Sequence, residues 1–327
     1  MMTERLSHAF WILAPGKGEI RARTLTAPTA DTLAIKTLYS GISRGTEALI
    51  WRGEVPSNQY QRMRAPFQEG EFPGPIKYGY ANVGQVEHGP SEWQGRVIFA
   101  LYPHESYYHL PIANAFLLPA KLPPERAILA ANTETALNAC WDAALQPGEK
   151  VRVIGGGVVG CLIAAICQAI PGADVELIDI NPAREAVANA LGVPFVMPNQ
   201  ATDEADVVIH SSASEQGLAL ALELAGDEAR VIEVSWYGDR SVSLSLGEHF
   251  HSRRLTLRSS QVGGIPPSMQ PRWNYRRRMQ KALDLLATQP QWDELIDGES
   301  DFTALPETMG QLAHGQGLCQ RIRYEES

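Results

Sequence analysis

The pattern of hydrophobic and polar positions changes near residue 150 of this 327-residue chain. Before about residue 130, short β-like runs are broken by Gly and Pro, as at residues 32–39, 81–86 and 96–101. These runs predict a compact, largely antiparallel β lobe over residues 1–130. A helical stretch at residues 127–145 closes this part of the chain.

From Lys150 onwards, short apolar strands alternate with helices. We expect strands at residues 151–154, 174–178, 206–209 and 229–234, and helices at residues 158–170, 182–191 and 216–224. This alternation predicts parallel βαβ units in a doubly wound α/β sheet. The regularity fades after about Ser259. We therefore predict a Rossmann block over residues 131–259, inserted in a β-rich lobe that resumes over residues 260–327.

A glycine-rich turn follows the first strand of that block. It reads Gly155-Gly156-Gly157-Val158-Val159-Gly160 and fits G-x-G-x-x-G. Gly155 permits the tight turn, Gly157 lets the backbone approach a diphosphate, and Gly160 lets the helix pack closely on the sheet. The free N–H groups at the helix start favour an anion. The turn therefore predicts a dinucleotide site, although a glycine turn can also simply join a strand to a helix.

An acidic residue at the end of the next strand indicates which dinucleotide binds. Asp179 stands 19 positions after Gly160, close to the spacing of about 20 typical of this fingerprint. Its carboxylate can hold both adenosine ribose hydroxyls and would repel a 2′-phosphate, which favours NAD(H). We place the adjacent Ile180 in the same site. Arg184 leaves NADP(H) open, because a nearby arginine can tolerate that phosphate.

Composition narrows the partners. The formal net charge is −9, which argues against a nucleic-acid partner, and no apolar run reaches the roughly 18 residues needed to span a bilayer. The first ten residues do not read as a signal peptide. The chain has four cysteines, which we expect to be reduced core thiols. A cytoplasmic location with no membrane partner is the expectation.

The chain resembles the medium-chain dehydrogenase/reductase superfamily over nearly its whole length. The likeness rests on Gly79…Gly84 before a Gly-Arg-Val turn at 95–97, a helix bearing Thr135 and the inserted Rossmann block. The segments 132–138, 235–239 and 258–263 are similar to a bacterial branch that includes the bacteriochlorophyllide hydroxyethyl dehydrogenases. The resemblance implies a GroES-like catalytic lobe and an oxidoreductase acting on a small alcohol or carbonyl substrate.

The residues that bind zinc in relatives are replaced in this chain. Where the family has a Cys before Thr-Asp, this sequence reads Ser43-Arg44-Gly45-Thr46-Glu47, and Gly79-Tyr80-Ala81 stands in place of Gly-His-Glu. The third ligand falls near Ala131 or Asn132, and no Cys precedes Cys140 to form a structural zinc loop. Thiolate and imidazole ligands make tight zinc sites, so we expect no zinc. His104, Glu105 and His109 are the one dense His/Glu cluster, but a strand-like geometry separates His104 from His109.

Without a metal, hydride transfer needs hydrogen-bond donors and an acid/base beside the nicotinamide. The resemblance places Ser43 and Thr46 in the former metal and proton-relay segment. We expect Tyr80 or His104 to be the acid/base, helped by the Thr46 hydroxyl, with Arg44 lowering the pKa of Tyr80. Two alternatives are structural: Tyr80 fills the volume of the lost zinc site, and His104 is a solvated turn residue.

The resemblance also implies residues that line the cofactor: Thr135, Ser235, Trp236 and Gln261 near the nicotinamide, and Arg321 reaching the pyrophosphate. The strand at residues 229–234, with Trp236, is expected to form an edge that pairs two subunits into a homodimer. Two other functions stay open. One is reduction of an activated C=C bond, as in quinone- or enoyl-reductase relatives. The other is a non-catalytic dinucleotide-binding role.

Overall fold

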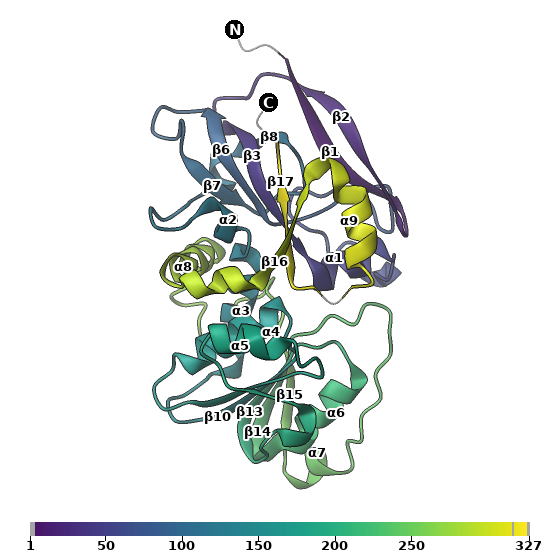
Figure 1. The fold of residues 1–327 in the computed structure, drawn as a ribbon, viewed down its shortest axis with the longest axis vertical. Coiled ribbons are helices and arrows are strands. Elements are labelled where there is room, and N and C mark those ends of the chain that lie inside the picture. Colours follow the sequence, from purple (N-terminus) through teal and green to yellow (C-terminus); the bar gives the residue numbers. More distant parts are fainter. Residues whose placement is uncertain (1–3, 316, 326–327) are drawn as a thin grey trace. The chain divides into compact units, whose positions relative to one another are not determined.

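A computed structural model describes residues 4–315 and 317–325, and its chain folds into two compact units (Figure 1). One unit holds the residues up to Ala131 and those from Leu283 onwards, and the other holds Asn132–Ala282. The first unit therefore takes both ends of the chain. Residues 1–3, 316 and 326–327, which the predicted β-rich lobe includes, lie outside the described part.

The first unit is built on two sheets. In one, strands lie in the order β2 (Lys17–Leu25), β1 (Arg5–Ala14), β5 (Ile76–Lys77) and β4 (Glu69–Gly70). The other runs in the order β16 (Ile296–Asp301), β17 (Cys319–Arg323), β3 (Thr32–Ser43), β6 (Asn82–His88), β7 (Val97–Ala100) and β9 (Phe116–Leu117), with β8 (Tyr107–Pro111) also paired to β3. Most of these pairs are antiparallel, as the alternating runs predicted, and β16–β17 is parallel.

The long strand β3 organises the first unit. It pairs with β6, β8 and the returning β17, and it ends at Ser43, where α1 (Arg44–Trp51) begins. Short helices complete the unit: α2 (Pro124–Ala127) and α9 (Leu305–Leu312), with 3₁₀ turns at Ser57–Gln59, Ile112–Asn114, Pro290–Leu295 and Phe302–Ala304. The junction of β3 with α1 carries the segment expected to hold catalytic residues.

The second unit is a parallel sheet with the strand order of a Rossmann fold. Its strands lie in the order β12 (Phe195–Val196), β11 (Asp174–Ile178), β10 (Lys150–Ile154), β13 (Ala205–His210), β14 (Ala225–Glu233) and β15 (Thr256–Ser259). Each neighbouring pair is parallel. The predicted α/β fold class, a Rossmann sheet beside a β-rich lobe, is confirmed.

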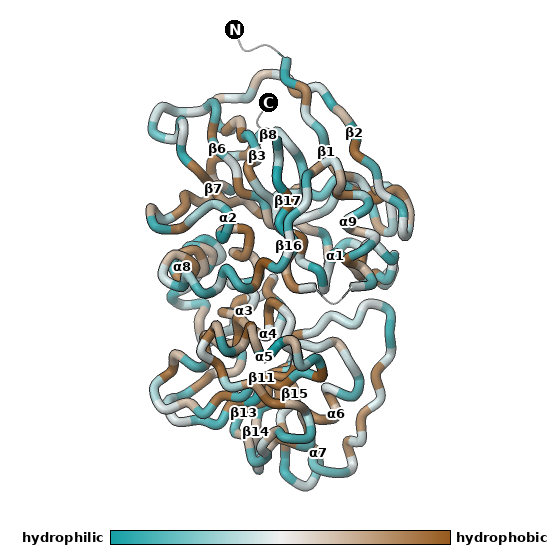
Figure 2. The backbone as a smooth tube through the Cα atoms, in the orientation of Figure 1, coloured by the Kyte–Doolittle hydropathy of each residue, from teal (hydrophilic) through white to brown (hydrophobic). Residues whose placement is uncertain are grey.

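Helices connect these strands: α3 (Ala130–Ala143), α4 (Val158–Gln168), α5 (Arg184–Ala190), α6 (Glu215–Leu224) and α7 (His249–Ser252), with a 3₁₀ turn at Pro198–Gln200. Figure 2 shows α4 and much of the sheet as hydrophobic. One core cluster packs strand residues such as Val208 and Val231 against Leu218 and Leu222 of α6. Burial of such side chains contributes about 1.5–3 kcal/mol each.

The second unit extends past residue 259, where the sequence pattern placed its end. Residues 260–282 cluster with it, and α8 (Tyr275–Thr288) passes from the second unit to the first. The buried Arg278 explains this, because its guanidinium binds Glu134 at 3.0 Å, Asn138 at 2.5 Å and the Val262 carbonyl at 2.6 Å. Arg278, which the sequence pattern indicated only as part of a basic segment, therefore links α8 to α3 by hydrogen bonds.

Strand β14 is not an edge strand, so the expected subunit-pairing edge is wrong. It pairs with β13 on one side and β15 on the other. The edge belongs to β15, whose residues are all exposed. The pattern of apolar residues could not predict which strand lies at the edge of the sheet. Both β14 and β15 follow a helix, so their places along the chain look alike. No helix within residues 4–315 and 317–325 has the length and apolarity needed to cross a bilayer.

Candidate functional site

The glycine-rich turn joins β10 to α4 and depends on glycine at both ends. Gly155 has φ +109°, and a Cβ there would lie 2.7 Å from the Ser212 nitrogen. A Cβ on Gly160 would lie 1.8 Å from the Gly155 carbonyl oxygen. The turn and the first turn of α4 are therefore pressed against each other and against the end of β13, which is the close packing that the motif predicts.

The middle of the turn, in contrast, is open. A Cβ on Gly157 would meet nothing within 4 Å, and Gly157, Val158 and Val159 are partly exposed. Gly157 is the N-cap of α4 and no side chain caps the helix. The first N–H groups of α4 therefore have no side-chain acceptor and face a space that a diphosphate could fill.

Asp179 is held against this turn by backbone donors. Its Oδ2 accepts from the Gly156 nitrogen at 2.6 Å, and its Oδ1 accepts from the Asn181 nitrogen at 2.8 Å. Each carboxylate oxygen keeps a second lone pair, so the ribose hydroxyls can still bind. Arg184 packs over the same glycine, with its Cγ 3.1 Å from where a Gly156 Cβ would lie. Ile180 is 81% exposed beside them.

The other cofactor residues suggested by resemblance lie on the second unit. Thr135, Ser235 and Trp236 are partly exposed, and Gln261 is exposed. The Ser235 hydroxyl accepts from the Ala213 nitrogen at 3.0 Å, and Gln261 accepts from the Gly263 nitrogen at 2.6 Å. Their role in cofactor binding stays a prediction.

Arg321 lies in a setting that the sequence did not indicate. Its guanidinium binds Glu299 at 2.6 Å and stacks on the Tyr39 ring at 5.5 Å. It lines a cavity of about 570 Å³ together with Glu125, Asp293 and Asp297. The ion pair with Glu299 engages the guanidinium within its own unit, and a role at the pyrophosphate stays a prediction.

Three of the four predicted catalytic residues meet where β3 joins α1. The hydroxyls of Ser43 and Thr46 hydrogen-bond the phenol of Tyr80. Tyr80 is partly exposed, and its ring packs edge-on against the buried Tyr78, with centroids 6.0 Å apart. The arrangement thus supports the phenolic oxygen of Tyr80 with two further hydroxyls.

The pKa of Tyr80 is raised, not lowered by Arg44 as expected. Burial is the main cause, and the nearby Glu47 carboxylate adds to it, while the bonds from Ser43 and Thr46 act in the opposite direction. Arg44 instead donates to the Gly315 carbonyl at 3.1 Å. Tyr80 is therefore a neutral hydrogen-bond donor throughout the physiological pH range.

His104 is the fourth predicted residue, and it is buried, so the solvated-turn interpretation is wrong. Its Nε2 lies 2.8 Å from Glu47 Oε2, and its Nδ1 lies 2.7 Å from the Ser40 hydroxyl. The Tyr324 hydroxyl lies 2.9 Å from Ser40. A carboxylate only accepts, so Nε2–H donates to Glu47, and when Nδ1 carries no proton it accepts from the Ser40 hydroxyl. This gives a directed chain from Tyr324 through Ser40 and His104 to Glu47.

Glu47 links this chain to the Tyr80 cluster. Its Oε1 accepts from the Ser43 nitrogen at 2.8 Å, and its side chain is 3% exposed. Sequence reasoning missed Glu47, Ser40 and Tyr324 as partners of His104. The structure also explains the glycine before Tyr80: Gly79 has φ +132°, and a Cβ there would lie 2.9 Å from the His104 ring. Glycine at 79 lets the imidazole lie against the backbone next to Tyr80.

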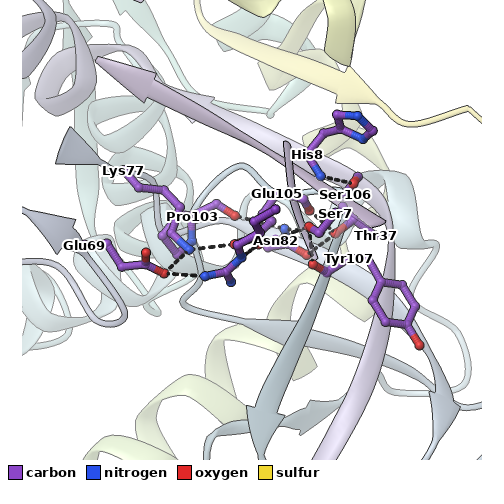
Figure 3. Close-up of polar contacts among 11 residues, drawn as sticks. Ser7, His8, Thr37, Glu69, Lys77, Asn82, Pro103, Glu105, Ser106 and Tyr107 are labelled. Carbon is purple, nitrogen blue, oxygen red and sulfur yellow. Dashed lines mark hydrogen bonds and ion pairs between the residues drawn. The ribbon is translucent and has the colours of Figure 1, made fainter. Parts of the chain in front are cut away.

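Glu105 belongs to a separate network, drawn in Figure 3. Its carboxylate accepts from Lys77 at 2.7 Å, Arg23 at 2.7 Å and Ser7 at 3.0 Å. Lys77 and Arg23 also bind Glu69. Glu105 therefore points away from the His104 chain, and the cluster His104, Glu105 and His109 does not converge. Within residues 4–315 and 317–325, no group of three or more His, Cys, Asp or Glu side chains could hold a metal ion.

Comparisons with known proteins place the fold among alcohol dehydrogenase-type enzymes. No family model matches the chain. An L-galactonate-5-dehydrogenase from Escherichia coli is 30% identical over 55% of this chain, and the match spans 58% of that relative's length. The chain thus spans little more than half of this relative and about a third of an L-threonine 3-dehydrogenase from Shewanella frigidimarina, which is 29% identical over 37% of this chain.

Solved structures cover the chain almost completely. A proposed zinc-binding dehydrogenase from Sinorhizobium meliloti, bound to NADP, superimposes with a TM-score of 0.78 at 18% identity, covering 98% of this chain and 99% of that one. An alcohol dehydrogenase from Escherichia coli in complex with NADH gives a TM-score of 0.76 at 15% identity, covering 97% and 99%. At these identities the likeness shows the fold.

Proposed function

We propose that the chain is an NAD(H)-dependent oxidoreductase that interconverts a small alcohol and a carbonyl compound without zinc, in a bacteriochlorophyllide dehydrogenase-like branch of the medium-chain superfamily. One observation carries the proposal. The glycine turn at 155–160 is closed by packing at both ends and open at Gly157, directly beside the Asp179 carboxylate. The dehydrogenase relatives and the dinucleotide-bound neighbours of the same fold support it.

The residues at this turn fit a dinucleotide. The N–H groups of Val158, Val159 and Gly160 would hold the diphosphate, and Asp179 would hold the adenosine ribose. Solved structures of this fold hold NADP or NADH, so the fold itself does not determine which of the two nucleotides binds. Asp179 favours NAD(H), because a 2′-phosphate next to its carboxylate is repelled. Arg184 is the residue that would reduce this repulsion.

In the proposed reaction the bound nicotinamide supplies or accepts the hydride. The Tyr80 hydroxyl donates a hydrogen bond to the substrate oxygen, which gains negative charge as the carbonyl is reduced. Because the pKa of Tyr80 is raised, its hydroxyl keeps the proton until an alkoxide forms and takes it. The Ser43 and Thr46 hydroxyls then stabilise the phenolate by donating to its oxygen. Tyr80 is thus the proposed acid.

His104 does not reach substrate directly in this mechanism, because both ring nitrogens are engaged inside the unit. It is a positioning residue that holds Glu47, whose other oxygen fixes the Ser43 backbone. This role differs from the direct acid/base role that the sequence indicated.

The donor set supports chemistry without zinc. The segments where relatives hold ligands carry Ser43 and Tyr80, and hydroxyls are poor ligands for zinc. Cys319 lies opposite Ser43 in the sheet, and burial raises the pKa of its thiol. His104 and Glu47 bind each other.

Turnover assays test this function. The intact protein should reduce carbonyl compounds with NADH at a rate unchanged by chelation, and metal analysis should find less than stoichiometric zinc. Tyr80→Phe should lower kcat by about 100-fold or more with little change in NADH affinity. Tyr78→Phe is the matched control, because this neighbouring tyrosine is buried behind Tyr80. Full activity of the Tyr80 variant, or activity only with added zinc, would contradict the proposal.

A panel of carbonyl and enone substrates in the same assay shows which bond is reduced. Exclusive turnover of enones would replace the proposed carbonyl chemistry.

We also propose that the chain is a cytoplasmic homodimer. The four cysteines are free and buried, which suits a reducing compartment. Pairing of two subunits would use the exposed strand β15, which includes the 36% exposed Leu257.

A further inference from the structure

A second cluster of polar side chains lies at the carboxyl ends of β13 and β14, and the proposed oxidoreductase chemistry leaves it unexplained. His210 ends β13 and Glu233 ends β14. His210 Nδ1 lies 2.7 Å from Glu233 Oε2, and His210 Nε2 lies 2.6 Å from the Ser212 hydroxyl. The ends of these neighbouring parallel strands therefore bring a serine, a histidine and a glutamate into one chain of hydrogen bonds.

The direction of each hydrogen bond follows from the carboxylate. Glu233 accepts from the Ser235 nitrogen at 2.7 Å and from the Tyr237 hydroxyl at 3.0 Å, so two donors orient its carboxylate. His210 must then donate through Nδ1. When Nε2 carries no proton, its lone pair can accept the Ser212 proton. These are the roles that a serine nucleophile, its base and the carboxylate that orients the base have in hydrolases, where geometry rather than sequence order identifies them.

Burial separates the three roles. His210 is fully buried and the Glu233 side chain is 13% exposed, whereas Ser212 is exposed. The exposed Ser212 hydroxyl can thus contact a small molecule, while the His210 imidazole and the Glu233 carboxylate are largely shielded from water. A buried ion pair of this kind would stabilise the imidazolium that forms when the serine loses its proton.

The backbone around Ser212 is shaped to this cluster. A Cβ on Gly217 would lie 2.4 Å from the Ser212 hydroxyl and 2.7 Å from His210 Nε2, so only glycine lets the first turn of α6 lie against the pair. Ala213 has φ +52°, a conformation that few non-glycine residues adopt. The Gly217 N–H donates to the Ser214 hydroxyl at 3.0 Å, and that hydroxyl lies 2.8 Å from the Ser212 hydroxyl, so the start of α6 is tied to the serine through Ser214.

We propose that Ser212, His210 and Glu233 form a second catalytic site, a serine esterase centre that takes small activated carboxylic esters. The Ser212 oxygen forms a bond to the ester carbonyl carbon as His210 Nε2 takes its proton. The carbon–oxygen bond to the alcohol then breaks, and the alcohol leaves with that proton. Water, deprotonated by His210, releases the carboxylic acid and restores the serine. No oxidant or reductant takes part.

Covalent labelling of the full-length protein tests this proposal. A fluorophosphonate probe should label the intact protein at Ser212, identified by peptide mass spectrometry, and p-nitrophenyl acetate should be hydrolysed. Ser212→Ala should abolish both. Glu233→Gln and His210→Asn should slow both by about 100-fold or more, since the base and its orientation are lost. Ser245→Ala, which removes an exposed serine outside the cluster, should change neither.

Absence of label on Ser212 of the intact protein would overturn the proposal without any variant. Labelling of Ser245 at the same rate, or rates unchanged in Glu233→Gln, would overturn it as well, because Ser212 would then be an ordinary solvated hydroxyl. Circular dichroism of each variant confirms folding. The assay contains no nicotinamide nucleotide, so its outcome is independent of the oxidoreductase proposed above.

Discussion

The two units organise candidate chemistry in opposite ways. In the second unit the proposed dinucleotide site is made mostly of backbone: a glycine turn and the N–H groups of α4, with the Asp179 carboxylate held by Gly156. In the first unit the candidate site is made of side chains that come from distant parts of the chain: Glu47 binds His104, and Ser40 joins His104 to Tyr324. A backbone site depends on local sequence, whereas a side-chain network depends on which strands pair.

The difference predicts that the first unit is the more sensitive to a single truncated side chain. Glu47→Ala would leave His104 and the Ser43 nitrogen without their buried acceptor, at a cost of about 1–3 kcal/mol for each unsatisfied donor. Turnover should fall by about 100-fold or more in the same variant. Chemical unfolding and steady-state kinetics measure the two effects.

Glu54→Ala is the matched control for this variant, since Glu54 pairs with Arg52 at the partly exposed end of the same segment. It should cost less than about 1 kcal/mol. Equal losses of unfolding free energy in the two variants would show that the Glu47–His104 hydrogen bond does not contribute specially to the stability of the first unit.

The backbone site should respond to one added methyl group. Gly157→Ala puts a Cβ into the open space where the diphosphate is proposed to lie, so NADH affinity should fall by about 10-fold or more while the fold is kept. Fluorescence titration with NADH measures this. Gly247→Ala is the control, because a Cβ there also meets nothing within 4 Å, yet it lies far along the chain from the turn. Unchanged affinity in Gly157→Ala would place the dinucleotide elsewhere.

Alkaline pH should separate the two units. Burial raises the pKa of Tyr78, Tyr80, Tyr108 and Tyr324 in the first unit above the ordinary value of 10. Unfolded tyrosines ionise near pH 10 while the folded ones stay neutral, so the unfolded state binds fewer protons and stability falls as pH rises above about 10. Each such group contributes up to about 1.4 kcal/mol of loss per pH unit.

Among the described tyrosines of the second unit, Tyr237 is the one whose pKa is clearly raised. Hydrogen exchange between pH 9 and 11, read separately for the two units, should therefore show the first unit opening earlier. Earlier opening of the second unit would contradict the assignment of these buried phenols.

The smallest expected effect is on assembly. Leu257→Lys on the exposed strand β15 should change the free energy of unfolding by less than about 0.5 kcal/mol. Light scattering should nevertheless show a shift from dimer towards monomer, because a charge on this edge opposes strand pairing. A variant that stays dimeric would move the proposed subunit contact away from β15.

Several parts of this protein could be predicted from local sequence. The alternation of strands and helices from Lys150 onwards is sufficient for the parallel sheet, because each βαβ unit has a fixed hand and a short connection. The turn at 155–160 and Asp179 could be placed together because they follow neighbouring strands that end on the same edge.

Only the tertiary structure decided the rest. Strand order made β15, not β14, the edge, and the buried Arg278 extended the second unit to Ala282. His104 acquired its partners because β3 ends beside the 79–80 segment and β17 returns to pair with it. Hydrophobic period reports how one segment lies against a core. It carries no information on which distant hydroxyl, imidazole and carboxylate the pairing of strands brings within hydrogen-bond distance.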